Sequence, residues 1–287
     1  MAALMALAAA ALFGATAPVA KALLSGISPL VLAGLFYVGA GLGASLFALR
    51  SKAPLQRADA PWLAGVVLAG GVLGPSLLFF GLQRSSASAT SLLLNLEAVF
   101  TTLLAIVLFR EKLGVRGLLA LLLLIAGAAL LTFERGGATP SLLGPLAVAG
   151  ACLAWGFDNN FTRRLADRDP LVVVAYKGLL AGSLSLTLGL ALGAHLPPLR
   201  PLLLALLVGA LGYGLSLVLY VRALRTLGAA RTGLLFATAP FTGALLSIPL
   251  LHELPTPSLA LAGSLMATGV LLLLRDPPQS QGQDPRS

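Results

Sequence analysis

Long apolar runs are the feature that most restricts what this chain can fold into. Hydrophobic residues make up 58% of the sequence, and only 10% of the residues are charged. The runs cover residues 2–22, 29–49, 61–83, 86–109, 115–133, 142–163, 171–193, 201–224, 229–251 and 257–274. A helix of about 20 residues crosses the hydrocarbon core of a bilayer and satisfies its own backbone amides. The sequence therefore predicts an all-α integral membrane protein with ten transmembrane helices.

The second half of the chain repeats the first. Adding 142 to the residue numbers from Gly81 to Lys112 leads, without a gap, to Ala223 to Leu254. The identical residues are Leu82, Ala87, Thr90, Leu92, Leu93, Leu103, Leu104, Ile106, Leu108 and Glu111, which recur as Leu224, Ala229, Thr232, Leu234, Leu235, Leu245, Leu246, Ile248, Leu250 and Glu253. Self-similarity of this kind indicates two copies of one unit.

Each copy holds five of the predicted helices. We assign the first copy to residues 1–134 and the second to residues 142–275. Residues 276–287 are polar throughout and are predicted to form a disordered cytoplasmic tail. Because five is an odd number, the second copy enters the membrane in the opposite sense to the first. Such inverted repeats surround the midplane binding sites of many secondary transporters.

The basic residues predict the orientation. With both termini cytoplasmic, the inside segments hold Arg50, Lys52, Arg57, Arg110, Lys112, Arg116, Arg163, Arg164, Arg168, Arg222, Arg225, Arg231, Arg275 and Arg286, and the outside segments hold Lys21, Arg84, Arg135 and Arg200. This positive-inside bias predicts a multi-pass protein of a bacterial-type plasma (inner) membrane. Because these residues lie in short clusters between apolar runs, the net charge of +9 does not indicate a nucleic-acid partner.

Three short motifs carry a family resemblance. They are Ala11-Leu-Phe-Gly14 with its echo Ala154-Trp-Gly156, the run Leu96-Glu97-Ala98-Val99-Phe100 leading to Phe109-Arg-Glu111, and Thr238-Ala-Pro240-Phe leading to His252-Glu253. Over nearly its whole length the chain resembles the EamA family of the drug/metabolite transporter superfamily. The resemblance implies solute transport, with substrates as diverse as amino acids, amines, sugars and drugs. It also implies a cavity among the first four helices of each copy, with helices 115–133 and 257–274 behind them.

The chain departs from the family pattern at one position. A proline usually follows the glutamate in the middle of the fourth helix, and here Ala98 stands at that place while the second copy keeps Pro240. A proline kinks a helix interior. We therefore expect helix 86–109 to be straighter than helix 229–251.

Glu97 is the first candidate for the transport site, with Asn95 two residues before it. A carboxylate at the bilayer centre is costly unless it is protonated, paired or hydrated, so it indicates function by default. It would either couple transport to protons or hold a cationic or amine group; the alternative is a structural hydrogen bond to a neighbouring helix. The second copy has Ala237 and Ala239 at the matching positions, so we expect the site to be asymmetric.

The helix predicted at 142–163 carries the most polar patch inside any apolar run. Trp155, Asp158 and Asn159 are candidates for solute binding, and Asn160 belongs to the same patch. Lys177 lies at a similar depth in the next helix, so Asp158 and Lys177 are expected to form an ion pair. This pair is either a gate toward the cytoplasm or a fixed structural pair, and Lys177 has the further alternative of extending to the headgroups.

Aromatic side chains complete the candidate site. Those expected near a cavity are Phe13, Tyr37, Trp155, Tyr176, Tyr213 and Tyr220. Aromatic walls suit amines and flat metabolites. Interfacial belts and helix packing are the alternative reading of each ring. Tyr213 is the strongest candidate because Gly212 and Gly214 on either side of it permit close approach of the backbone.

The remaining polar residues do not indicate an enzyme. His252-Glu253 begins like a zinc-protease motif, but Thr256 occupies the place of the second histidine. We therefore expect no enzymatic activity, no metal site and no cofactor. Glu111 and Glu253 are expected to tie helix ends to the following loops.

Glycine pairs bear on the oligomeric state. They are Gly39 with Gly43, Gly70 with Gly74 and Gly178 with Gly182. Such pairs let helices pack closely, either within one chain or across a homodimer, so both a monomer and a homodimer stay open.

The pattern as a whole predicts a secondary transporter for a small metabolite, which is an amino acid, an amine or a drug-like solute. We expect it to work by alternating access as a proton-coupled exporter. A facilitated uniporter or a channel-like membrane protein is the alternative, and an intramembrane enzyme is the least favoured reading.

Overall fold

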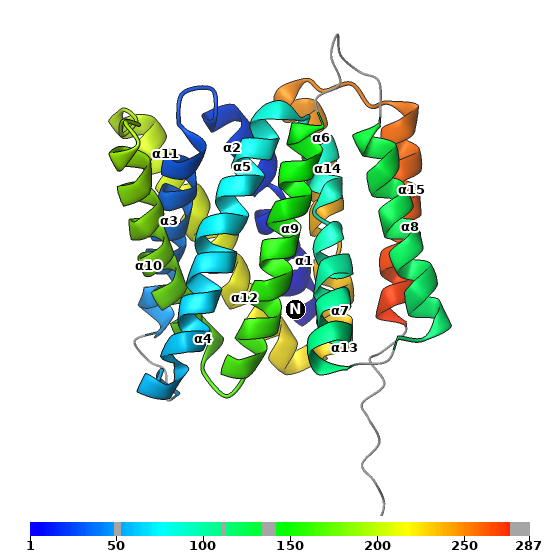
Figure 1. The fold of residues 1–287 in the computed structure, drawn as a ribbon, viewed down its shortest axis with the longest axis horizontal. Coiled ribbons are helices and arrows are strands. Elements are labelled where there is room, and N and C mark those ends of the chain that lie inside the picture. The colour runs from blue at the N-terminus through cyan, green and yellow to red at the C-terminus, as the bar shows by residue number, and fades with distance from the viewer. Residues whose placement is uncertain (49–52, 111–112, 134–141, 276–287) are drawn as a thin grey trace, which may run out of the picture.

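The computed structural model describes residues 1–48, 53–110, 113–133 and 142–275, and every regular element within these residues is helical (Figure 1). The predicted tail 276–287 and Glu111 lie outside the described residues. Large apolar side chains point outward over the helices, as lipid contact requires; Leu46 and Val107 are more than 70% exposed.

The helices follow one another in two comparable series. The first half contains α1 (Ala2–Gly14), α2 (Thr16–Leu23), α3 (Pro29–Ala48), η1 (Arg57–Asp59), α4 (Ala60–Gly65), η2 (Val66–Leu73), α5 (Gly74–Arg84), α6 (Ala87–Leu93), α7 (Leu96–Phe109) and α8 (Val115–Thr132). The second half contains α9 (Leu143–Thr162), η3 (Arg163–Leu165), α10 (Pro170–Ala191), α11 (Leu199–Gly209), η4 (Ala210–Leu215), α12 (Ser216–Leu227), α13 (Ala229–Phe236), α14 (Ala239–Leu251) and α15 (Pro257–Leu274).

The described residues contain 9 helical segments that are long and apolar enough to cross a membrane. They are Ala2–Leu23, Pro29–Ala48, Arg57–Arg84, Ala87–Leu108, Val115–Thr132, Pro170–Ala191, Leu199–Leu227, Arg231–Leu251 and Pro257–Leu274. The prediction of a multi-pass, all-helical membrane protein is therefore confirmed. Helix α9 is not among the 9 because Asp158, Asn159 and Asn160 lower its hydropathy. It packs against α5 and α7, and its crossing of the membrane stays a prediction (Figure 1).

Two of these segments are interrupted in the middle. The break between α6 and α7 falls at Leu94 and Asn95, and the break between α13 and α14 falls at Ala237 and Thr238. The first of them is therefore interrupted although Ala98 stands in place of the proline; that it is the straighter of the two stays a prediction. Asn95 donates its side-chain amide to the backbone carbonyl of Leu92 at 2.9 Å, and such local side-chain bonding offers the backbone an alternative to the helix.

Other local features also recur at the offset of 142 residues. The η2 and η4 segments are π-helical and interrupt comparable helices, α4–α5 and α11–α12. Both Arg110 and His252 adopt the left-handed conformation, with φ of 54° and 53°, and end α7 and α14 respectively. Left-handed residues are uncommon outside glycine, so their recurrence at equivalent positions supports a common ancestry of the two halves.

The glycine pairs are used inside the chain. Gly178 and Gly182 of α10 face α3, where an added Cβ on Gly182 would lie 2.6 Å from the backbone nitrogen of Val38. Gly39 of α3 faces the backbone of Leu206 in α11 in the same way. These contacts explain the pairs as intramolecular packing surfaces.

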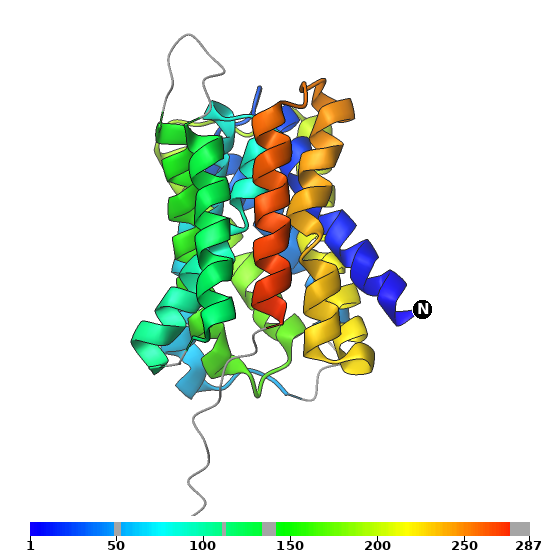
Figure 2. The same ribbon diagram turned by 90° about the vertical axis from the view of Figure 1, so that its right-hand side faces the viewer.

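Helices α8 and α15 lie side by side at one edge of the molecule (Figure 2). Gly127 of α8 packs against Met266 of α15. Helix α8 contributes no described residue to the cavity described below, as expected for a helix behind it. Helix α15 does contribute, through Val270, Leu273 and Leu274, so the expectation that it also lies behind is wrong.

Candidate functional site

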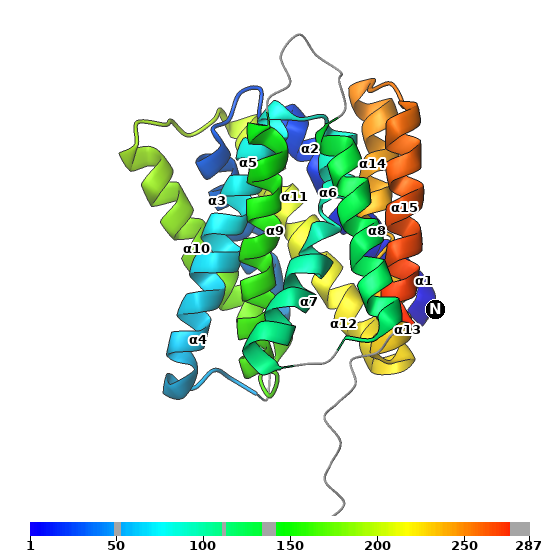
Figure 3. The same cartoon turned by 45° about the vertical axis from the view of Figure 1, so that its right-hand side comes forward.

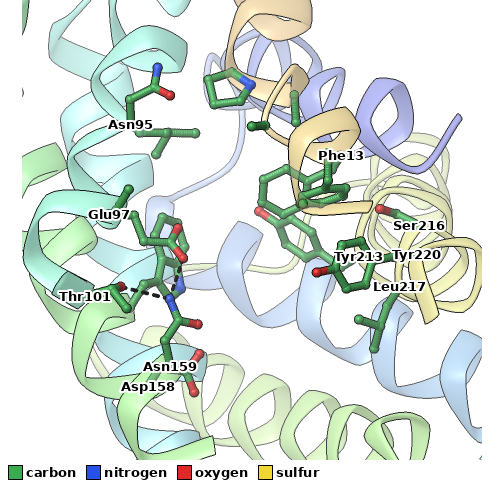
Figure 4. Close-up of a pocket in the computed structure, with 18 of the residues that line it drawn as sticks. Phe13, Asn95, Glu97, Thr101, Asp158, Asn159, Tyr213, Ser216, Leu217 and Tyr220 are labelled. Carbon is green, nitrogen blue, oxygen red and sulfur yellow. Dashed lines mark hydrogen bonds between the residues drawn. The ribbon is translucent and has the colours of Figure 1, made fainter. Parts of the chain in front are cut away.

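A cavity of about 720 Å³ lies between the two halves of the chain. Its walls come from α1, α3, α7, α9, α10, α12, α13, α14 and α15 together with η4 (Figure 4). The size falls within the range of small-molecule pockets. The cavity is therefore the candidate site for a small molecule.

The structure brings the sequence-predicted residues together around this cavity. The lining includes Phe13, Tyr37, Asn95, Glu97, Trp155, Asp158, Asn159, Lys177 and Tyr213. Tyr220 lines it as well, whereas Tyr176 is 52% exposed and does not. The prediction for Tyr176 is wrong because the composition of a helix does not fix which face turns inward.

Glu97 lies in the first turn of α7, directly after the break. Its Oε1 accepts a hydrogen bond of 2.7 Å from Nδ2 of Asn159, and the same nitrogen lies 3.1 Å from Oγ1 of Thr101 (Figure 4). No described lysine, arginine or histidine forms an ion pair with Glu97. The start of a helix is a favourable place for a carboxylate because of the helix dipole.

Asp158 and Lys177 form an ion pair in the cavity wall. The Nζ of Lys177 lies 2.5 Å from Oδ2 of Asp158, and both side chains are largely buried. Thr162 also contacts the carboxylate, at 3.5 Å. Gly70 of η2 leaves room for this carboxylate, which any side chain at that position would displace. The wall therefore holds one neutralised pair beside the single carboxylate of Glu97.

Tyr37 and Trp155 are held by one backbone carbonyl. The Tyr37 hydroxyl donates to the Gly70 oxygen at 2.7 Å, and Nε1 of Trp155 donates to the same oxygen at 2.9 Å. Gly70 belongs to the π-helical η2, and π segments occur frequently at functional sites. Both side chains therefore present their apolar surfaces, with their polar atoms already bonded.

The opposite wall is aromatic. The ring of Phe13 lies 5.5 Å from that of Tyr213 and 5.6 Å from that of Phe236, and Tyr220 lies 5.0 Å from Phe236. Figure 4 shows Phe13, Tyr213 and Tyr220 across the cavity from Glu97. Centroid distances of this size are those of favourable ring pairs.

Sequence reasoning missed several lining residues. Thr101 and Phe236 are the two with the clearest contacts, and Ser216 also lines the cavity. Thr101 lies four residues after Glu97 and therefore on the same helix face, which is a signal that the sequence contains. Phe236 sits at the end of α13, where only the position of the break brings it to the cavity.

Asn95 borders the cavity, but its side-chain nitrogen is engaged within the protein. Its side-chain nitrogen is bonded to the Leu92 carbonyl and contacts the sulfur of Met266 at 3.9 Å. The residue is buried, and Figure 4 shows it apart from the cluster of Glu97, Asp158 and Asn159. We therefore assign Asn95 to the break between α6 and α7 more than to direct contact with a solute.

A helical membrane protein with a polar cavity between its two halves has an architecture that is typical of solute transporters. Both halves match the EamA-like transporter family, over residues 1–133 and 142–275, and this chain belongs to that family. A relative from Methanothermobacter thermautotrophicus, named "Uncharacterized transporter", is 30% identical over 284 residues, which cover 91% of this chain and 82% of the relative. A solved structure titled "Crystal structure of protein" shares the fold, with a TM-score of 0.67 at 22% identity over 94% of this chain and 95% of that one.

Proposed function

We propose that this protein is a secondary transporter that carries a small solute through the central cavity by alternating access. The observation that carries the proposal is the cavity itself, with an unpaired carboxylate, Glu97, among apolar membrane helices. An acid at this depth needs a proton, a cation or water, and each of these is a part of transport.

The proposed architecture is ten transmembrane helices in two inverted repeats. It takes α9 as the sixth span and assigns the first repeat to residues 1–134 and the second to 142–275. The paired helix breaks, the paired π segments and the paired left-handed residues support it. An inverted repeat provides two states of similar energy, one open to each side, which alternating access requires.

The contacts at the two ends of the molecule support an inward-open state. The cavity lining includes Gly233 of α13 and Leu274 at the end of α15. Helix α13 and the last turn of α15 lie at the lower end of the molecule in Figure 3. By the positive-inside rule this end faces the cytoplasm of a bacterial-type inner membrane, as both termini do.

Polar contacts join helix ends on the other side. The Glu253 carboxylate accepts hydrogen bonds from the backbone N–H groups of Ala87 and Ser88, at 2.6 and 2.9 Å. Lys21 donates to the carbonyl oxygens of Leu82 and Ser85, at 2.5 and 2.8 Å. Glu253 thus ties the second half to the start of α6 in the first half, and not to its following loop as the sequence suggested. We assign these contacts to closure of the outer side.

Glu97 is the proposed coupling group of a proton-driven exporter. Protonation removes its charge when the cavity is dry, and deprotonation restores it when the cavity is hydrated. The Asp158–Lys177 pair is formed in this inward-open structure, so we propose it as a fixed pair of the cavity wall and not as the gate that closes the cytoplasmic side. A facilitated uniporter differs from this mechanism only in lacking the proton step.

The test is transport by purified protein in liposomes, with a panel of labelled amino acids and amines and an imposed pH gradient. Glu97→Gln keeps the size and the bond to Asn159 while removing the titrating group. Asp167→Asn is the matched control, since Asp167 is exposed in the segment after α9 and lies outside the cavity. We expect gradient-driven transport by the wild type and the control, and transport without a pH response by Glu97→Gln.

Two results contradict the proposal in different ways. An intact pH response in Glu97→Gln removes Glu97 as the coupling group and favours the uniporter. Absence of any solute movement by folded protein contradicts the transporter and favours a channel-like or structural role.

A further inference from the structure

The cavity has two unlike walls, and the difference carries information on the solute. One wall, from α7, α9 and α10, holds every charged residue of the lining: Glu97, Asp158 and Lys177. The other wall, from α1, η4, α12 and α13, holds the rings of Phe13, Tyr213, Tyr220 and Phe236 (Figure 4). A solute that fills the cavity must therefore touch charge on one side and aromatic faces on the other.

The charges of the polar wall leave a net negative site. Lys177 is bound to Asp158 at 2.5 Å, so these two charges neutralise each other. Glu97 has one described donor, the amide of Asn159, which reaches Oε1 alone. Its other carboxylate oxygen has no described hydrogen-bond partner, and Glu97 is only half-buried, so this oxygen is open to the cavity.

The same three charges also disfavour binding of a solute that carries an anionic group. A carboxylate or phosphate in a low-dielectric cavity needs a cation or several N–H donors. Lys177 is the one cation among the described lining residues, and binding an anion there would release the Asp158 charge into the wall. Stranding one partner of a buried pair is strongly unfavourable.

The aromatic wall suits a flat or apolar body that carries a positive charge. Phe13, Tyr213 and Phe236 form a continuous chain of ring contacts, with centroids 5.5 and 5.6 Å apart. The faces of aromatic rings attract cations as well as apolar groups. Both walls therefore favour the same chemical class.

We infer that the solute is an organic amine with one positive charge and a flat apolar body, whose ammonium group binds Glu97 and whose body lies on the rings of Phe13, Tyr213 and Phe236. The inference rests on the proposed function, because it names the substrate class of the same cavity. It separates amines from the amino acids and neutral metabolites that the size of the cavity alone admits.

The test compares three compounds with the same phenyl ring and two-carbon chain. They are 2-phenylethylamine, which is a cation, phenylalanine, which adds a carboxylate, and 3-phenylpropanoate, which is an anion. Binding to the purified full-length protein is measured by isothermal titration calorimetry in detergent. We expect the amine to bind at least about tenfold more tightly than either of the other two, because it alone pairs Glu97 without disturbing Lys177.

Two variants test the roles of the two walls. Glu97→Gln is expected to weaken binding of the amine by about tenfold or more, while Asp167→Asn leaves it unchanged. Phe236→Leu is expected to weaken it by a smaller factor, about threefold, because part of the ring contact remains. Retention of the bond from Asn159 makes Glu97→Gln the mildest change at that position, and a thermal melt verifies that each variant is folded.

Three outcomes overturn the inference: equal or tighter binding of phenylalanine or 3-phenylpropanoate, no binding of the amine by folded protein, or amine binding that Glu97→Gln leaves unchanged. These outcomes are distinct from a failure of the proposed function. Transport of an amino acid without amine binding contradicts the inference and keeps the transporter. Amine binding without transport of any solute in liposomes keeps the inference and contradicts the transporter.

Discussion

The crossing of α7 with α9 and the crossing of α14 with α1 share one geometry. An added Cβ on Gly156 of α9 would lie 3.1 Å from the backbone nitrogen of Thr101, and one on Gly14 of α1 would lie 3.0 Å from that of Gly243. These two pairs of residues are related by the same offset of 142. The two copies therefore place a glycine at equivalent helix crossings, where close packing demands it.

The two crossings differ in the residue that stands beside the glycine. In the second copy Ala239 borders the cavity but is almost fully buried, and its carbonyl lies directly against Gly14. In the first copy the equivalent residue is Glu97, which turns into the cavity toward Asn159. Similar packing thus permits unlike chemistry, because one half of the chain has a carboxylate beside this crossing and the other half has an alanine.

The largest expected effect comes from making the polar wall resemble its apolar equivalent. Lys177→Leu replaces the cation of the pair with an apolar side chain. Alone it strands the Asp158 charge and is expected to lower the free energy of unfolding by about 3–5 kcal/mol. Adding Asp158→Thr, which introduces the residue found at Thr16, is expected to recover much of that loss. Denaturant unfolding in detergent measures both, and additive losses in the double variant would show that the pair is not coupled.

The reverse exchange is expected to have the next largest effect. Ala239→Glu places a carboxylate at the tight crossing with Gly14 and is expected to destabilise the protein by about 2.5–3.5 kcal/mol. Glu97→Ala, its counterpart, is expected to change stability by less than about 1 kcal/mol because Glu97 faces the cavity. The measurement is the free energy of unfolding of the two variants, determined by denaturant in the same detergent. Equal losses would mean that the two crossings do not differ as described.

The smallest expected effect concerns the helix break itself. Ala98→Pro gives the first copy the proline that the second has at Pro240. Ala98 lies in the first turn of α7, where a proline is tolerated, but the substitution removes the hydrogen bond of 3.2 Å from the Ala98 N–H to the Asn95 carbonyl, so we expect a loss of about 1 kcal/mol in the free energy of unfolding. A loss of several kcal/mol, measured in the same way, would show that the two breaks have different geometry.

Much of the fold follows from hydropathy alone, because a bilayer leaves the backbone few choices. The apolar run 142–163 also predicts a helix at α9, but Asp158, Asn159 and Asn160 lower its hydropathy below that of the 9 helical segments. The residues that lower it line or support the cavity. Hydropathy is therefore least reliable where a membrane protein keeps its polar site.

The contacts within the site depend on helix rotation and helix crossing angles, which the sequence alone does not give. Tyr176 and Tyr213 are both predicted from the sequence to lie near the cavity, but only Tyr213 lines it, because packing sets the rotation of each helix. The partner of Glu253 lies 165 or more residues away along the chain, at the start of α6. Glu97 and Asn159 could be named from the sequence, but their hydrogen bond depends on the angle at which α7 crosses α9.

The position of the Gly70 carbonyl oxygen limits the insertions and deletions that this part of the sequence can tolerate. Tyr37 and Trp155, from two different helices, both bond to that oxygen, which lies within the wider π turn of η2. Loss of one residue anywhere in η2 would tighten the turn to an α-helix and rotate the carbonyl away from both rings. The length of residues 66–73 is therefore as constrained as any side chain of the cavity, although none of these residues lines it.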